Sequence, residues 1–217
     1  MSDVVRGLAV VHVDDALLVL DKPSGLLAVP GRGADKQDCV SARVQARYPD
    51  ALIVHRLDMD TSGLMVMARG PVAQRALSMA FAARAVTKRY LAVVAGRVKP
   101  PAGEWGCIDL PLVCDWPNRP RQIVDHAIGK PSLTRWRVLV HDVTHDATHV
   151  ELEPVTGRSH QLRVHLAARG HPILGDPLYA PAAVQARAPR LMLHAWRLAF
   201  EHPVTADAMT FERPAPF

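Results

Sequence analysis

The sequence predicts an α/β or α+β fold with a mixed, largely antiparallel sheet. Apolar and β-branched runs of strand length are frequent, segments with helical periodicity are few, and several runs are joined by turn sequences short enough for hairpins. Hydrophobic residues make up 49% of the 217 residues, which is enough for a substantial core and excludes a disordered chain. We therefore expect one compact domain over residues 1–217.

The chain opens with a predicted β-hairpin, which a short helix follows. Residues 8–13 and 16–20 have strand character and meet at an Asp-Asp turn. A helix is predicted over residues 38–48, because Asp38 is a suitable N-cap, valines recur one helical turn apart and a proline follows the end.

A second strand pair and a longer helix come next. Residues 51–54 and 64–67 are apolar strands on either side of a polar turn. A helix is predicted from Pro71 to about residue 83, because proline is favoured in the first turn and apolar residues recur at helical spacing. Residues 88–95 alternate and are rich in β-formers, so they are predicted to form a strand with Tyr90 near its end.

The second half of the chain is predicted to contain an irregular insertion, a strand pair and one more helix. Residues 99–121 hold five prolines and two tryptophans, which favours a surface excursion over a long element. Residues 133–140 and 148–152 pair as strands, and residues 157–170 form a turn and then a helix that Gly170 ends. The last predicted strands are residues 190–200 and 208–211.

Missing motifs argue against several functional classes. No apolar stretch is long enough to span a membrane, and the N-terminus lacks the basic and apolar pattern of a signal peptide. The three cysteines, Cys39, Cys107 and Cys114, form no Cys-x-x-Cys pair, which argues against a disulfide framework or a zinc finger. Phosphate-loop and dinucleotide fingerprints are missing as well. We expect a cytoplasmic protein that does not bind a membrane.

The charge balance favours a polyanionic partner without naming one. Lysine and arginine number 26 against 21 aspartates and glutamates, and the sequence pI is about 9.4. Arginine supplies most of the positive charge, and its planar guanidinium suits phosphate contacts and stacking on bases.

The most informative stretch is HRLDMDTSG at residues 55–63, which places Asp58 in a turn between two apolar strands, where it can face a cleft. Asp58 and Asp60 can equally well cap the turn, and the local sequence leaves this alternative open. Tyr90 at a strand start and Arg158 beside a predicted helix N-terminus are further candidates, because backbone N–H groups at such a terminus already attract anions. A structural ion pair is the alternative for Arg158.

A metal site can be assembled on paper from His160, His165, His171 and Asp176. The spacing argues against it, because five residues turn His160 and His165 about 140° apart on a helix, whereas chelating pairs are three or four residues apart. Hydrogen bonds at the helix start and phosphate contacts are the simpler roles for these histidines.

Six motifs, taken in order, resemble the RluA family of pseudouridine synthases and cover the chain almost from end to end. They are DKPSGL at residues 21–26, HRLD with TSG at 55–63, KRY at 88–90, PVTGRSHQLRVH at 154–165, GHPILGD at 170–176 and RLMLHA at 190–195. The chain resembles the short, dual-specificity members in two ways. It enters the catalytic domain without an N-terminal S4-type domain, and DLPLVCDWPNRP at 109–120 is similar to their insertion.

The resemblance implies the pseudouridine synthase fold and the isomerisation of uridine to pseudouridine in RNA. In this reaction the N1 glycosidic bond breaks, the base turns and C5 bonds to C1′. The resemblance assigns Asp58 as the essential carboxylate, Tyr90 as the residue that stacks on the flipped base and a candidate acceptor of the C5 proton, and Arg158 as the partner of Asp58 before substrate binds. Neither a metal nor a cofactor is implied, because there is no redox change or group transfer.

The implied partner is RNA, in stem-loops of 23S ribosomal RNA and of the transfer RNA anticodon loop at position 32, with a monomeric enzyme and no obligate protein partner. Because the target nucleotide must be flipped out, Arg56 is implied to fill the gap, and a phosphate contact is the alternative. Further implied RNA contacts come from His55, Lys88, Arg89, His160, Arg163 and Leu193. A catalytically silent RNA-binding module and a histidine-based metal hydrolase are the competing classes.

Overall fold

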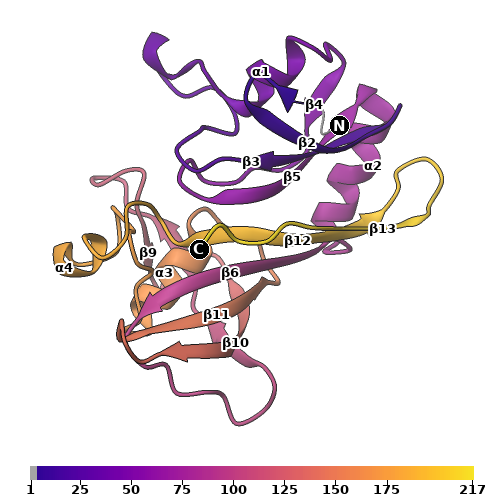
Figure 1. Cartoon of the computed structure of the whole chain (residues 1–217). Helices are drawn as coiled ribbons and strands as arrows, with labels where there is room; N and C mark the ends of the chain where they lie inside the picture. The colour runs from indigo at the N-terminus through magenta and orange to yellow at the C-terminus, as the bar shows by residue number, and fades with distance from the viewer. Residues whose placement is uncertain (1–3) are drawn as a thin grey trace. The chain divides into compact units, whose positions relative to one another are not determined.

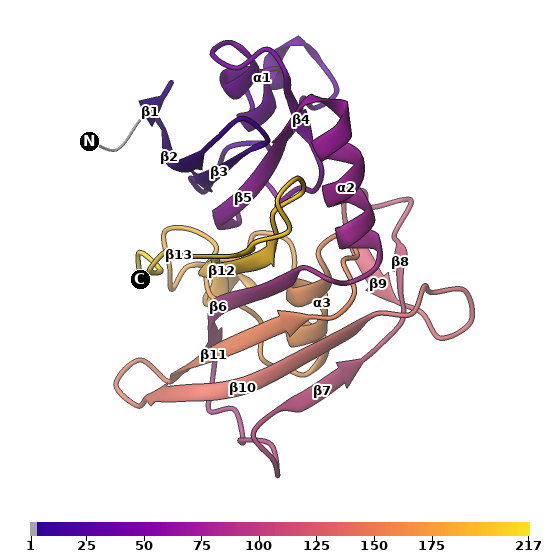
Figure 2. The same cartoon turned by 90° about the vertical axis from the view of Figure 1, so that its right-hand side faces the viewer.

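The computed structural model describes residues 4–217, which form two compact units (Figures 1 and 2). The first unit comprises Met1–Lys88 and His194–Pro216, and the second comprises Arg89–Leu193 with Phe217. Each unit has its own hydrophobic core. Within the described residues, no helix has both the length and the apolar character needed to cross a membrane.

The first unit is built on strands that are antiparallel except at one pairing. Its strands follow one another in the order β1 (Val4–Val5), β2 (Leu8–Val13), β3 (Leu17–Lys22), β5 (Ser62–Arg69) and β12 (Leu193–Glu201), with β4 (Ala51–Ile53) paired to β5 and β13 (Ala208–Glu212) paired to β12. Only β5 and β12 run parallel, with His194 opposite Ser62. The predicted hairpin at the start of the chain and the predicted last strand are confirmed.

Helix α2 (Gly70–Ala82) covers the core of the first unit beside β4 and β5 (Figure 2). Its Leu77 packs among buried residues of the sheet such as Leu17, Leu64 and Val66. This helix begins with a proline in its first turn, as predicted, because the missing N–H of proline costs nothing there.

Helix α1 (Val40–Gln45) is shorter than predicted, and its N-cap is Cys39 instead of Asp38. Cys39 is extended, and its Sγ accepts the N–H of Ala42 at 3.4 Å. The carboxylate of Asp38 instead forms an ion pair with Arg43 at 2.6 Å, so it is not available to the backbone. The 3-10 turn η1 (Ala34–Lys36) precedes this helix.

The second unit contains a run of antiparallel strands with one helix packed on it. Its strands follow the order β6 (Thr87–Ala95), β11 (Ala147–Pro154), β10 (Leu133–Asp142) and β7 (Gly106–Asp109), the first two residues of β6 belonging to the first unit. Helix α3 (Gln161–Ala168) buries Leu162 and Leu166 against this sheet, among Val150 and Leu152. The short helix α4 (Ala182–Gln185) comes later in the chain.

The prediction of an irregular insertion over residues 99–121 is wrong in part. This stretch contains β7, which extends the sheet at its edge, and β8 (Leu112–Cys114), which pairs with β9 (Gln122–Val124) in a separate hairpin. The prolines that suggested irregular structure lie between these strands and not within them, so they interrupt no ladder of hydrogen bonds.

Candidate active site

The backbone of the Asp58 turn is held by hydrogen bonds at three successive carbonyl groups. The N–H of Thr61 donates to Asp58 O at 3.2 Å, and the N–H of Gly25 donates to Met59 O at 2.9 Å. The hydroxyl of Ser24 donates to Asp60 O at 2.7 Å. The turn lies between β4 and β5 of the first unit, as predicted, and the Asp58 side chain is half-buried.

Lys22, at the end of β3, ties this turn to the loop that precedes it. Its side chain is fully buried, and Nζ donates to the carbonyl oxygens of Pro23, Leu26 and Met59 at 2.9, 2.7 and 2.8 Å. Three donors of an ammonium group thus meet three carbonyl acceptors, which offsets part of the cost of burying its charge. Lys22 is not among the site residues predicted from the sequence, although a lysine that closes an apolar strand is the signal that could have identified it.

His55 is positioned by contacts within the first unit. Its Nε2 accepts the N–H of Val66 at 3.0 Å, and its ring stacks on Phe81 with the ring centroids 4.5 Å apart. Burial, together with the charge of Lys88, lowers the pKa of His55 to about 3. The ring is therefore neutral and carries its proton on Nδ1. Arg56, the next residue, is exposed.

The start of β5 is fixed by a close approach to β12. Gly63 has φ +113, and a side chain there would collide with the backbone of Ala195. Next to it, Ser62 Oγ is hydrogen-bonded to Nδ1 of the buried His194 at 2.8 Å, and Nε2 of that histidine donates to Arg213 O at 3.1 Å. These residues hold the carboxyl end of the Asp58 turn.

In the second unit, Gln161 organises the turn that carries Arg158. Its Oε1 accepts from the N–H of Arg158 at 3.0 Å and from the Thr156 hydroxyl at 2.7 Å. Its Nε2 donates to Leu133 O and to Thr134 Oγ1, both at 3.0 Å. Gln161 is 3% exposed, and its amide links the turn to the first residues of β10.

The Arg158 side chain is exposed, and its Nε donates to the carbonyl oxygen of Pro131 at 3.3 Å. His160, the N-cap of α3, is hydrogen-bonded through Nδ1 to the Tyr179 hydroxyl at 2.6 Å. That hydroxyl also accepts the N–H of Gln122 at 2.8 Å, so Tyr179 joins the start of α3 to β9. The helix start beside Arg158 confirms the local structure predicted from the sequence.

The predicted RNA contacts through Arg163 and Leu193 do not fit their burial. Arg163 is 2% exposed and pairs with Asp176 through two hydrogen bonds, from Nε at 2.8 Å and from Nη2 at 2.6 Å. Leu193 is 2% exposed within the hydrophobic core of the second unit. Both residues belong to motifs that combine packing with chemistry, and the sequence alone does not separate the two.

Tyr90 lies on β6 opposite Leu152 and packs, partly buried, against the core of the second unit. Its neighbour Arg89 forms an ion pair with Glu153 at 2.9 Å, and its guanidinium lies 4.4 Å from the ring centroid of Trp105. Glu153 also pairs with Arg135 at 2.9 Å. The predicted RNA contact of Arg89 would thus have to compete with this network.

The four residues that could be assembled into a metal site are engaged elsewhere. Nε2 of His165 donates to Leu110 O at 3.0 Å, Nδ1 of His171 is bonded to Ala95 O at 2.9 Å, and Asp176 pairs with Arg163. Burial lowers the pKa of His165, against the opposing effect of its bond to Leu110. No group of three or more metal-ligating side chains occurs in residues 4–217.

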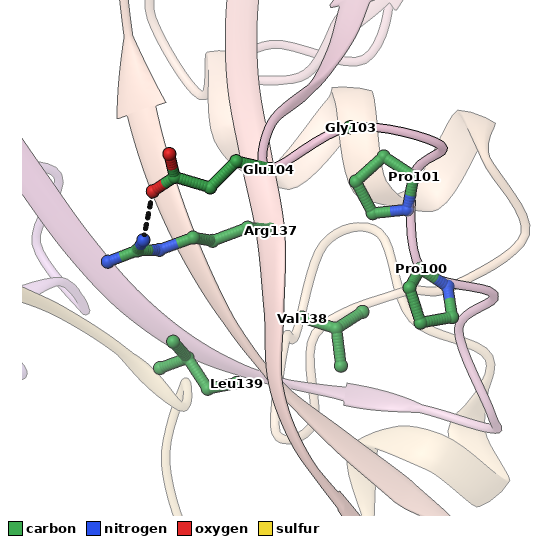
Figure 3. Close-up of a pocket in the computed structure, with 7 residues that line it drawn as sticks. All are labelled: Pro100, Pro101, Gly103, Glu104, Arg137, Val138 and Leu139. Carbon is green, nitrogen blue, oxygen red and sulfur yellow. Dashed lines mark hydrogen bonds and ion pairs between the residues drawn. The ribbon is translucent and has the colours of Figure 1, made fainter.

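The second unit also contains a pocket of about 340 Å³ (Figure 3). Its wall includes the ion pair between Glu104 and Arg137, whose Oε1 and Nη1 are 2.7 Å apart. The lining residues are Pro100, Pro101, Gly103, Glu104, Arg137, Val138 and Leu139. None of the predicted site residues is among them.

Comparisons with known proteins agree with the motifs. Residues 16–168 match the family model described as RNA pseudouridylate synthase. Proteins named dual-specificity RNA pseudouridine synthase RluA, from Escherichia coli strain K12 and Yersinia pestis, are 49% and 48% identical over 210 residues. Both alignments cover 97% of this chain, with 94% of the Escherichia coli protein and 100% of the Yersinia pestis protein.

Two solved human structures share the fold. RNA pseudouridylate synthase domain containing 1 is 29% identical with a TM-score of 0.79, over 100% of this chain and 87% of the human one. RNA pseudouridylate synthase domain containing 4 is 25% identical with a TM-score of 0.74, over 95% of this chain and 88% of the human one. The predicted fold class is confirmed by this similarity.

Proposed function

Because this chain belongs to the RNA pseudouridylate synthase family and is an RNA pseudouridine synthase, we propose that it modifies uridines in stem-loops of both ribosomal and transfer RNA. The observation that carries the proposal is the match of 97% of the chain to relatives whose names state dual specificity. The proposed targets are one uridine of 23S ribosomal RNA and the uridine at position 32 of the transfer RNA anticodon loop. The proposed enzyme is a cytoplasmic monomer.

Asp58 is the carboxylate of the proposed reaction. A carboxylate can act as a nucleophile or as a base in such a reaction. The hydrogen bonds at the Asp58, Met59 and Asp60 carbonyls support this role, because they fix the backbone from which the carboxylate projects. The N1 to C1′ bond breaks, the base turns, C5 bonds to C1′, the C5 proton leaves and N1 gains a proton.

Tyr90 and Arg158 supply the other two groups. Tyr90 stacks on the flipped base, since a phenol ring offers a flat apolar face and a hydroxyl that can accept the C5 proton. Arg158 supplies a planar cation that pairs with a carboxylate or a phosphate. Its turn is preorganised by Gln161, which satisfies the backbone N–H of Arg158.

Arg56 fills the gap that the flipped nucleotide leaves. Opening a stem-loop costs a few kcal/mol, and a guanidinium that stacks in place of the base offsets part of that cost. The exposure of Arg56, two residues before Asp58, supports this role. The remaining proposed RNA contacts are half-buried: His55, Lys88, Arg89 and His160.

A tritium-release assay tests the proposed reaction. RNA labelled at C5 of uridine releases tritium when C5 bonds to C1′, so purified protein should release it from a transfer RNA anticodon stem-loop and from a ribosomal RNA fragment. Release that survives added chelator supports the synthase, release lost with chelator indicates a metal enzyme, and no release indicates an RNA-binding module. Pseudouridine mapping in RNA from a deletion strain then identifies the targets, and loss at only one of the two RNAs rules out dual specificity.

A further inference from the structure

The β8–β9 hairpin of the second unit presents an exposed tryptophan at its tip. Trp116 is 67% exposed, and the guanidinium carbon of Arg119 lies over its ring, 4.6 Å from the centroid. Every residue from 116 to 121 is exposed. Tryptophan is usually well covered in folded proteins and is enriched where proteins contact partners, so an indole in this position points to a binding role.

Hydrogen bonds within the tip hold it in one conformation. The N–H of Asn118 donates to Asp115 O, the N–H of Arg121 donates to Asn118 O, and the N–H of Asp115 donates to Arg121 O, at 3.1, 3.1 and 3.0 Å. The Asn118 side chain adds a bond from Nδ2 to Asp115 Oδ2 at 2.9 Å. Such a tip offers the indole in a preorganised position, which lowers the entropy cost of binding.

The tip of the hairpin presents two exposed arginines, Arg119 and Arg121. The two nearby carboxylates accept hydrogen bonds within turns. Asp115 accepts from the Asn118 side chain, and Asp125 accepts the N–H groups of Ala127 and Ile128. Within residues 4–217, Arg119 and Arg121 form no ion pair with a carboxylate, and each lies over an aromatic ring. Exposed arginines interleaved with aromatic rings are typical of surfaces that bind single-stranded nucleic acid.

The hairpin is connected to the turn that carries Arg158. Tyr179 accepts the N–H of Gln122 in β9 and is bonded to His160 at the start of α3. The Arg158 side chain donates to the carbonyl of Pro131, one residue after Lys130, whose backbone pairs with Leu112 of β8. Figure 2 shows β9 beside α3. The tip and Arg158 therefore belong to one connected part of the second unit.

We propose that Trp116 and Arg119 form a stacking platform for an unpaired nucleotide of the substrate RNA, outside the target uridine, and that Arg121 contacts the RNA backbone. This proposal rests on the proposed function, because it takes RNA as the substrate. Aromatic rings stack on any base, whereas a phosphate contact alone would not require an indole. The platform would contribute to the affinity for a structured RNA and not to the chemical step.

RNA affinity measured by fluorescence anisotropy tests the platform. Trp116→Leu should weaken the binding of an anticodon stem-loop by about fivefold to a hundredfold, the range measured for base–aromatic stacking, while Trp116→Tyr should stay close to wild type. The dependence of affinity on salt should not change in Trp116→Leu, because no charge is removed. Arg121→Gln should lower the salt slope by about one unit. Ile128→Ala, at another exposed apolar residue of the same unit, is the matched control.

Turnover separates this proposal from the proposed function. At saturating RNA, Trp116→Leu should convert uridine at the wild-type rate, so that KM rises and kcat does not. Wild-type affinity in Trp116→Leu, in an enzyme that makes pseudouridine, overturns the platform and leaves the proposed function intact. If wild-type protein binds the stem-loop but makes no pseudouridine, the proposed function fails, and the affinities of the variants still decide on the platform. Unchanged thermal unfolding of each variant excludes misfolding as the cause of a loss.

Discussion

Asp58 projects from a backbone that its neighbours hold in place. We expect Asp58→Asn to abolish pseudouridine formation and to leave RNA affinity within about tenfold of wild type, because an amide keeps the shape of the side chain but is neither a carboxylate nucleophile nor a base. The hydrogen bonds of the turn involve backbone atoms, so the fold should be retained. Tritium release and anisotropy measure the two properties. Turnover above a few per cent of wild type would rule out Asp58 as the essential group.

Lys22 holds the same turn through the hydrogen bond from its buried ammonium group to Met59 O. Lys22→Met keeps much of the volume but removes the ammonium donor from the carbonyls of Pro23, Leu26 and Met59, of which Met59 O keeps the N–H of Gly25. This should cost about 1–3 kcal/mol in the free energy of unfolding for each carbonyl left unsatisfied. We expect a clear loss of stability and a fall in kcat with little change in RNA affinity. Urea denaturation and single-turnover rates measure these effects. Stability equal to wild type would show that the buried ammonium is no better than an apolar side chain.

Arg56 is tested by comparing two RNA substrates. Arg56→Ala should slow modification of a stem-loop more than that of a short unstructured RNA with the same target uridine, because only the folded loop must be opened and its gap filled. A salt series completes the measurement. Equal losses on both RNAs, with a salt slope lower by about one unit, would leave Arg56 as a phosphate contact only.

Among the elements, β5 and α2 are joined through the neutral ring of His55. Its pKa is about 3 in the folded protein and about 6.5 when unfolded, so the unfolded chain takes up a proton that the folded protein does not, and stability decreases as the pH falls below 6.5. His55 should contribute at most about 1.4 kcal/mol per pH unit to this loss. Chemical denaturation between pH 6.5 and 5 measures it. His55→Phe should show a shallower dependence, and an equal slope in both proteins would contradict the neutral ring of His55.

The turn before α3 is held by hydrogen bonds of the Gln161 side chain. Gln161→Leu removes the acceptor for the N–H of Arg158 and the donors to β10, so kcat should fall by about tenfold while RNA affinity changes little. Gln74→Leu is the matched control, because Gln74 also donates to a backbone carbonyl but lies on α2. Similar kcat values in the two variants would mean that Gln161 has no positioning role.

On the scale of the whole molecule, the arginines include both buried and exposed residues. Arg163 pairs with the buried Asp176, whereas Arg56, Arg119, Arg121 and Arg158 are exposed. Arg163→Met should reduce stability by about 3–5 kcal/mol and leave the salt dependence of RNA binding unchanged, because the buried cation meets no phosphate. Denaturation and salt titration measure both properties. A reduced salt slope in this variant would show that Arg163 reaches RNA after all.

Local hydrophobic periodicity and turn chemistry were sufficient to predict the fold class, most strands and helices, and the positions of Asp58 and Arg158 in turns. The prediction over residues 99–121 was wrong because the prolines there favour irregular structure, whereas β7 and β8 lie between those prolines and pair with β10 and β9, respectively. Only the tertiary structure decided that Arg163 and Leu193 are buried and that Lys22 and Gln161 hold the site turns. Burial and hydrogen-bond partners depend on residues distant in sequence, so no local pattern encodes them.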